Sequence, residues 1–163
     1  MNVNDVLVER LAGELSKRGA RIATAESCTG GWISKTLTDT PGSSVWFEYG
    51  FVSYGNTAKT RMLGVAAALL EQQGAVSEAV ALAMAEGAMR ESGAEFAVAV
   101  TGIAGPEGGT ADKPVGTVWV AWCGKDQQPA TAQHGFEGDR DTVRRQTVTQ
   151  ALNGLVRFIE NAN

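Results

Sequence analysis

Hydrophobic positions recur along the chain with two different periods, and segments of the two kinds alternate from one end to the other. Apolar residues three or four positions apart predict amphipathic helices over residues 4–18, 31–37, 56–63, 77–92 and 139–159, with a short alanine-rich helix ending near residue 73. Runs of apolar and β-branched residues predict strands over residues 20–25, 45–54, 96–100, 115–122 and 130–136. Because strands and helices interleave, we expect a single domain, residues 1–163, with helices on both faces of a mostly parallel or mixed sheet.

The first predicted helix shows the pattern most clearly. Leu7, Leu11 and Leu15 recur every four residues, so they fall on one face of a helix that packs on the core. Asn4 or Asp5 is expected to cap its N-terminus, because the side-chain oxygen of either residue accepts a backbone N–H of the first turn.

Composition narrows the classes of function. Hydrophobic residues make up 44% of the chain and the net charge is −4, so the overall basic field of a nucleic-acid-binding protein is missing. The apolar runs are too short to span a bilayer, and we recognise no signal peptide. Two cysteines, Cys28 and Cys123, form neither a disulfide framework nor a zinc-binding spacing, which fits a reducing cytoplasm. With one histidine, His134, we expect neither a multi-histidine metal site nor a histidine-based triad.

The first chemical feature is Ser27, which lies where the predicted strand 20–25 turns into the next helix. A nucleophile at such a corner is exposed above the sheet edge, and the free N–H groups of Thr29, Gly30 and Gly31 could hold a developing oxyanion. The alternative is that Ser27 or Thr29 only caps the helix. Cys28 is a rival nucleophile, although neighbouring residues that leave a strand point to opposite sides.

The second feature is Lys59, in the segment that follows Tyr54. Asn56 is a plausible N-cap, which places Lys59 in the first turn of a short helix, where the helix dipole disfavours an ammonium. The alternative is a solvated surface lysine. Since no histidine is at hand to serve as base for Ser27, Lys59 is the candidate for that role.

A glycine-rich loop follows the apolar strand 96–100. It begins with Thr101 and Gly102, includes Gly105, and lets main-chain N–H groups approach a ligand, often a phosphate. Its sequence matches neither a Walker A motif nor a dinucleotide-binding fingerprint. The alternative is a flexible connection without a ligand.

Two arginines open the last predicted helix. Arg140 and Arg144 are four residues apart and share one face, beside the free N–H groups of the helix start. Two guanidinium groups in that position suit a phosphate or a carboxylate. The alternative is surface pairing with Glu137, Asp139 or Asp141.

These features converge on one edge of the predicted sheet. In open α/β sheets, ligands bind past the carboxyl ends of the strands, and Ser27, Tyr54 and Thr101 all fall at such ends.

Several motifs together resemble the CinA C-terminal domain family, and the resemblance covers nearly the whole chain in order. The motifs are Thr24-Ala25-Glu26-Ser27-Cys28-Thr29-Gly30-Gly31, Val52-Ser53-Tyr54-Gly55-Asn56-Thr57-Ala58-Lys59, Gly74-Ala75-Val76-Ser77, Thr101-Gly102-Ile103-Ala104-Gly105-Pro106, Lys113-Pro114-Val115-Gly116-Thr117-Val118 and Gly138-Asp139-Arg140.

The resemblance implies a single three-layer α/β/α domain with a mixed, mostly parallel sheet of about five or six strands. Stand-alone members of this family are nicotinamide mononucleotide amidases, which release ammonia and nicotinic acid mononucleotide in pyridine nucleotide recycling. Carried onto this sequence, the family pattern makes Ser27 the nucleophile and Lys59 its general base, with Tyr54 assisting. It also implies a homo-oligomer.

These roles form a coherent mechanism that requires no metal and no cofactor. Burial and the helix dipole would lower the pKa of Lys59 so that it can accept the Ser27 proton. The loop from Gly102 to Gly105, with Arg140 and Arg144, would hold the phosphate or ribose. Two alternatives stay open: a non-catalytic nucleotide-binding module, and an amidase for another small amide.

Overall fold

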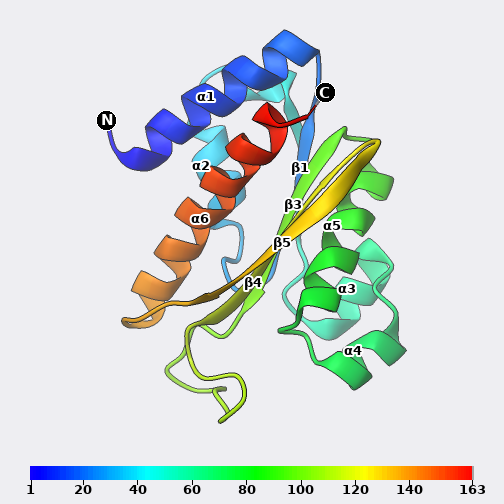
Figure 1. Cartoon of the computed structure of the whole chain (residues 1–163), viewed down its shortest axis with the longest axis vertical. Coiled ribbons are helices and arrows are strands. Elements are labelled where there is room, and N and C mark those ends of the chain that lie inside the picture. The colour runs from blue at the N-terminus through cyan, green and yellow to red at the C-terminus, as the bar shows by residue number, and fades with distance from the viewer. Residues whose placement is uncertain (163) are drawn as a thin grey trace.

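The computed structural model describes residues 1–162, which form one sheet with helices on both of its faces (Figure 1). The helices, in chain order, are α1 Val3–Arg18, α2 Trp32–Thr38, α3 Asn56–Leu63, α4 Ala67–Gln73, α5 Glu78–Ser92 and α6 Arg140–Glu160, and a 3₁₀ turn spans Ser43–Val45. The strands are β1 Ile22–Glu26, β2 Phe47–Val52, β3 Phe96–Gly102, β4 Thr117–Gly124 and β5 Gln127–Gly135.

The sheet has five strands in the order β2-β1-β3-β4-β5. Strand β1 pairs in parallel with β2 and with β3, whereas β4 and β5 join the sheet in antiparallel pairs. Helices α1, α2 and α6 cover one face, and α3, α4 and α5 cover the other (Figure 1). The three-layer arrangement and the mixed sheet predicted from the sequence are confirmed.

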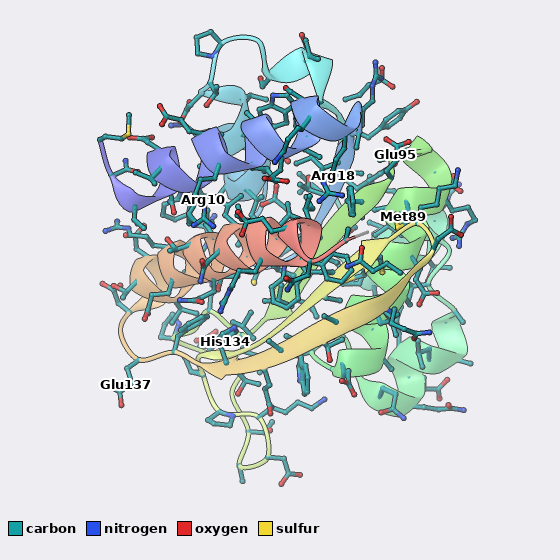
Figure 2. The ribbon with its side chains drawn as sticks, turned by 45° about the horizontal axis from the view of Figure 1, so that its top comes forward. Arg10, Arg18, Met89, Glu95, His134 and Glu137 are labelled. Atoms are coloured by element: carbon teal, nitrogen blue, oxygen red, sulfur yellow. The ribbon has the colours of Figure 1, made fainter. Side chains whose placement is uncertain are left out.

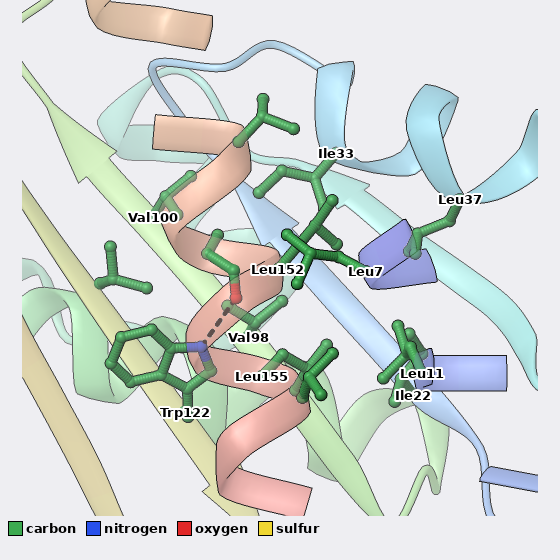
Figure 3. Packing of buried hydrophobic residues seen from close by; sticks show 14 of the residues in the cluster. Leu7, Leu11, Ile22, Ile33, Leu37, Val98, Val100, Trp122, Leu152 and Leu155 are labelled. Atoms are coloured by element: carbon green, nitrogen blue, oxygen red, sulfur yellow. Dashed lines mark hydrogen bonds between the residues drawn. The ribbon is translucent and has the colours of Figure 1, made fainter. Parts of the chain in front are cut away.

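The two faces of the sheet have cores of different character. Large side chains from α1, α2 and α6 meet alternate residues of the strands, and the Trp122 indole N–H donates to the Ala151 carbonyl at 3.0 Å across that layer (Figure 3). On the other face, α5 packs closely through small residues such as Ala81, Ala85 and Ala88. Both faces of the sheet are covered, so all of β1 is buried and β3 is almost continuously apolar.

The helix boundaries follow the hydrophobic pattern, but the first cap differs from the prediction. Helix α1 is capped by Asn2, whose side chain accepts the Asp5 N–H, while the Asp5 carboxylate accepts the Asn2 N–H. Asp5 is therefore the third helical residue of a capping box, and Asn4 lies within the first turn.

The aromatic segment predicted as one long or broken strand is broken. The 3₁₀ turn occupies its start, and β2 carries one extra residue where its pairing with Ile22 and Ala23 shifts. Gly50 lies in β2 against Ser34 of α2, and a Cβ at this position would overlap the Ser34 hydroxyl. The glycine thus allows α2 to approach the sheet closely.

The register brings the carboxyl ends of three strands together. Glu26, the last residue of β1, is paired with Val52 of β2 and with Val100 of β3. Consequently Ser27 and the segment after Val52 leave the sheet at one edge. Strand β3 continues to Gly102, so Thr101 and Gly102, predicted to open the glycine-rich loop, are still strand residues that pair with Trp119 and Val118 of β4 at this edge. Within residues 1–162, no helix combines the length and the apolar character needed to cross a membrane.

Candidate functional site

Ser27 follows the last residue of β1, at the predicted corner. Its backbone N–H donates to the Val100 carbonyl at 3.1 Å, which holds the corner against β3. Gly30 and Gly31 then take positive φ values of 59° and 105°, a region that side chains rarely adopt, before α2 begins. The turn keeps Ser27 at the sheet edge with 8% of its surface exposed.

Lys59 comes from α3 and reaches the same corner. Its side chain is 1% exposed, and its Nζ lies 2.9 Å from Ser27 Oγ, 3.0 Å from the Ser53 carbonyl and 2.8 Å from the Tyr54 carbonyl. Burial lowers the pKa of Lys59 below its ordinary value, because the ammonium loses its hydration there. Gly55, rather than the predicted Asn56, occupies the N-cap of α3, and Lys59 is its fourth residue.

Tyr54 contributes through two separate groups. Its backbone carbonyl accepts from Lys59 Nζ and, at 3.3 Å, from the Ser27 hydroxyl. Its side chain is 58% exposed, and the phenolic oxygen accepts from Arg140 Nη2 at 3.3 Å. The phenol therefore lies toward the arginine, and it is the carbonyl that faces the serine and the lysine.

A pocket of about 210 Å³ opens at Ser27. Besides Ser27, Lys59 and Tyr54, its lining comprises Cys28, Asn56, Ala75, Val76, Thr101, Gly102, Ala104 and Arg140. Thr101 is buried, and its hydroxyl donates to the Ala75 carbonyl at 2.9 Å, so that it anchors one wall. The structure thus brings Thr101, Gly102 and Arg140 to the candidate nucleophile.

The two arginines at the start of α6 diverge. Arg140 Nη1 donates to the Gly105 carbonyl at 2.8 Å, and the exposed side chain lines the pocket mouth. Arg144 turns to the corner instead, donating to the Cys28 carbonyl at 3.0 Å and to the Thr29 carbonyl at 3.1 Å. Within residues 1–162, two of the predicted substrate contacts, Arg144 and Gly105, do not line the pocket. Gly105 instead accepts a hydrogen bond from Arg140 through its carbonyl.

Some backbone N–H groups of the turn after Ser27 donate hydrogen bonds within the protein, and others do not. The Gly30 N–H donates to the Ser27 carbonyl at 3.0 Å, and the Gly31 N–H donates to the Glu26 carboxylate at 3.2 Å. The Thr29 hydroxyl also donates to Glu26, at 2.6 Å. Within residues 1–162, the N–H groups of Cys28 and Thr29 donate no hydrogen bond to another residue, so these two are better candidates for an oxyanion than those of Gly30 and Gly31.

Cys28 follows Ser27 but differs from it in environment. Its side chain belongs to the core cluster on the α1, α2 and α6 face and is 5% exposed. Burial raises the pKa of its thiol to about 12, which keeps the thiolate scarce near neutral pH. Of the two neighbours, Ser27 is the one that Lys59 contacts.

Several residues of the site were not predicted as site residues, although Asn56 was considered as a helix cap. Asn56, Ala75 and Val76 line the pocket, and Glu26 organises the corner. All belong to the motifs quoted above, which is the one signal that could have identified them.

His134 lies on the edge strand β5, stacked on Phe136, outside the pocket lining (Figure 2). Within residues 1–162, no group of three His, Cys, Asp or Glu side chains is arranged to hold a metal ion.

Comparison with known proteins finds one family along nearly the whole chain. The profile of the CinA C-terminal domain matches residues 4–159. Curated relatives include two proteins named nicotinamide-nucleotide amidohydrolase PncC. The one from Pseudomonas putida is 54% identical over 152 residues (93% of this chain, 94% of the relative), and the one from Escherichia coli strain K12 is 51% identical over 156 residues (95% and 94%).

A solved structure extends the agreement to three dimensions. The competence/damage inducible protein CihA from Agrobacterium tumefaciens matches this structure with a TM-score of 0.94 and 43% sequence identity, over 97% of this chain and 96% of that chain. Since the family profile covers nearly all of the sequence and relatives above 50% identity span most of it, the chain belongs to the CinA C-terminal domain family.

Proposed function

We propose that this protein hydrolyses the carboxamide of nicotinamide mononucleotide to nicotinic acid mononucleotide and ammonia, with Ser27 as nucleophile and Lys59 as general base. The observation that carries the proposal is the buried Lys59 Nζ at 2.9 Å from Ser27 Oγ, inside a pocket that has Arg140 at its mouth. Relatives named for this amidohydrolase activity, at 54% and 51% identity, support the choice of substrate.

The contacts of Lys59 suit a neutral amine. Two of its three neighbours are carbonyl oxygens, of Ser53 and Tyr54, which only accept hydrogen bonds. A neutral amine has two hydrogens and one lone pair, so it can donate to both carbonyls and turn its lone pair to the Ser27 hydroxyl. Because burial lowers the pKa of Lys59, this form is more populated than for a solvated lysine.

The reaction proceeds in two halves with Lys59 as the proton carrier. Ser27 Oγ bonds to the amide carbon while its proton passes to Lys59 Nζ, and the N–H groups of Cys28 and Thr29 hold the oxyanion. Lys59 then protonates the departing nitrogen, the C–N bond breaks, and ammonia leaves an ester on Ser27. Water attacks this ester, gives a proton to Lys59 and restores Ser27 as the acid departs.

Arg140 gives the pocket its preference for a nucleotide. It is exposed at the mouth and held by the Gly105 carbonyl and the Tyr54 phenol, which leaves a guanidinium facing the entrance. We assign it to the phosphate, since arginine binds phosphate with strong, directed hydrogen bonds. Thr101, Gly102 and Asn56 would contact the remainder of the substrate.

We further propose a cytoplasmic, single-domain homo-oligomer that acts on a small molecule, with no nucleic-acid or membrane partner and no cofactor. The net charge of −4 and the two buried, unpaired cysteines support the compartment and the lack of a nucleic-acid partner. Size-exclusion chromatography with light scattering measures the oligomer.

The deciding experiment incubates the purified protein with nicotinamide mononucleotide and measures ammonia together with nicotinic acid mononucleotide by mass spectrometry. Nicotinamide riboside and nicotinamide serve as substrates without the phosphate. We expect both products in equal amounts from the mononucleotide and far slower turnover of the other two. Binding of the mononucleotide without ammonia release would instead indicate a non-catalytic nucleotide-binding module, and equal turnover of all three would indicate a general amidase.

A further inference from the structure

Glu26 is a carboxylate that is fully buried next to the proposed nucleophile. Five hydrogen bonds reach it: Oε1 accepts from the Thr29 hydroxyl at 2.6 Å, the Gly31 N–H at 3.2 Å and the Ile33 N–H at 2.8 Å. Oε2 accepts from the N–H and the hydroxyl of Ser34 at 2.9 and 2.7 Å. A buried carboxylate is costly unless donors of this kind surround it.

Glu26 supplies the cap that α2 otherwise lacks. The N-cap residue of this helix is Gly31, which has no side chain to accept the first N–H groups. Those groups point at Glu26, five residues earlier and on the far side of the turn. The carboxylate therefore closes residues 26–34 into a hydrogen-bonded ring, and Ser27 is one of the residues in this ring.

The backbone of Glu26 reaches the other half of the site. Its carbonyl accepts the Ser53 N–H at 2.9 Å, and the Ser53 carbonyl in turn accepts from Lys59 Nζ. One residue thus connects the turn that carries Ser27 to the segment that holds Lys59. The N–H groups of Cys28 and Thr29 belong to the same ring, between Glu26 and the donors of α2.

We infer that Glu26 is a positioning residue for the reaction: its carboxylate fixes Ser27 Oγ relative to Lys59 Nζ and to the N–H groups of Cys28 and Thr29. The inference rests on the Ser27–Lys59 mechanism proposed above. A purely structural cap would contribute stability alone. A positioning residue also sets the reactivity of the serine in the folded protein, with little effect on substrate affinity.

The test compares Glu26→Gln with the control Leu37→Ala. Glutamine keeps the shape but turns an NH₂ group toward at least one backbone N–H, so one side of the ring is broken. Leu37 is buried in the last turn of α2, and its truncation loosens the packing of the helix while leaving all five donors in place. Each protein is assayed well below its melting temperature for kcat, KM and the rate of Ser27 sulfonylation by phenylmethanesulfonyl fluoride. This reagent forms an Oγ–S bond with loss of fluoride and of the hydroxyl proton.

For Glu26→Gln we expect kcat to fall about 100-fold, the cost that a displacement of about 1 Å can have, with KM nearly unchanged. Its sulfonylation rate should fall in parallel. Leu37→Ala should melt earlier yet keep the wild-type kcat and sulfonylation rate. A folded Glu26→Gln protein with wild-type values of both, or with only a raised KM, would overturn the inference.

Two further arms keep the test decisive. If Glu26→Gln does not fold, Ser34→Ala removes a single donor and should lower kcat about tenfold, the value of one hydrogen bond to a charged group; an unchanged kcat would contradict the inference. If the wild type is sulfonylated at Ser27 but releases no ammonia from the mononucleotide, the proposed substrate fails, and the sulfonylation rates still decide the role of Glu26. If the wild type is not sulfonylated at Ser27, both proposals fail.

Discussion

Two charged side chains, Glu26 and Lys59, are buried on opposite sides of Ser27, and their hydrogen-bond partners differ in kind. Glu26 has no exposed surface and faces α2, where five donors surround its carboxylate. Lys59 is 1% exposed and comes from α3 on the other face of the sheet, where its three contacts are neutral oxygen atoms. Within residues 1–162, no carboxylate forms an ion pair with Lys59.

The difference lies in what surrounds each side chain. Three backbone N–H groups at the start of α2 donate to the Glu26 carboxylate. Lys59 lies near the same kind of helix end, where its charge is disfavoured, and burial lowers its pKa further. We infer that the Glu26 carboxylate organises the corner and that Lys59, as a neutral amine, is the proton acceptor.

The alternation of a β-strand produces this arrangement. Successive residues of β1 point to opposite faces, so Glu26 turns to the layer of α2, and the next residue, Ser27, turns to the layer of α3. Cys28 then returns to the core of the first layer. A one-residue shift would exchange the positions of the serine and the cysteine.

The largest expected effect is therefore at Ser27. Ser27→Ala removes the hydroxyl that Lys59 contacts and should abolish ammonia release from nicotinamide mononucleotide. Cys28→Ser should retain most of the activity, because the Cys28 thiol is buried with its pKa raised to about 12. An active Ser27→Ala enzyme, or loss of activity at Cys28 alone, would reverse the assignment.

The next effect concerns the proton acceptor. Lys59→Arg keeps a positive charge but cannot deprotonate, so kcat should fall about 10²- to 10⁴-fold, nearly as far as in Lys59→Met. In the wild type, kcat/KM should rise with pH through the lowered pKa of Lys59, because the neutral amine is the active form. Circular dichroism serves as the folding control, and a folded, active Lys59→Arg enzyme would exclude the base role.

The fold was largely predictable from the hydrophobic pattern, and the exceptions have local causes. The last strand was expected to begin at residue 130 after a turn over 124–129. In the structure, Gly124 pairs with Gln127 across a two-residue turn, so β5 starts three residues earlier. The polar residues of that stretch have little strand propensity, and pairing with β4 holds them in the sheet.

The site was predictable in part. Residue type and strand position identified Ser27, and the lack of a histidine base pointed to Lys59, 32 positions further along the chain. The capping by Glu26 and the inward turn of Arg144 were not foreseen, because both depend on which donors and carbonyls meet in three dimensions. The spacing of Arg140 and Arg144 places them on one face of the helix. It does not show which carbonyl groups lie within reach of each side chain.

The third prediction separates these arginines. Arg140→Ala should raise KM for nicotinamide mononucleotide about ten- to a hundredfold, the loss of one charged hydrogen bond, with little change for nicotinamide riboside. Arg144→Ala frees the carbonyls of Cys28 and Thr29, so it should lower kcat for both substrates instead. Initial rates over a range of each substrate give both constants. Equal KM effects of the two variants would mean that both arginines bind the phosphate.

The smallest effect tests the charge of Lys59 without any substrate. A lysine whose pKa is lowered in the folded state binds fewer protons there than in the unfolded chain, between the folded pKa and the ordinary value of 10.5. Over that interval, stability should rise with pH by at most about 1.4 kcal/mol per pH unit for this one group. Below the folded pKa and above 10.5, its contribution is constant.

Urea unfolding of the wild type and of Lys59→Met, from pH 7 to pH 11, isolates this contribution. Groups that titrate in this range without contacting Lys59, such as the Cys123 thiol with its pKa raised to about 12, are present in both proteins and cancel in the difference. The Cys28 thiol interacts with Lys59, but burial raises its pKa to about 12, so it stays largely protonated over most of this range. The stability of the wild type relative to Lys59→Met should therefore increase as the pH rises towards 10.5. If the site stabilised the ammonium instead, the pKa of Lys59 would be raised, and this difference would stay constant up to pH 10.5 and fall above it. A stability difference that does not rise with pH would contradict a lowered pKa for Lys59, and with it the difference between the two buried side chains.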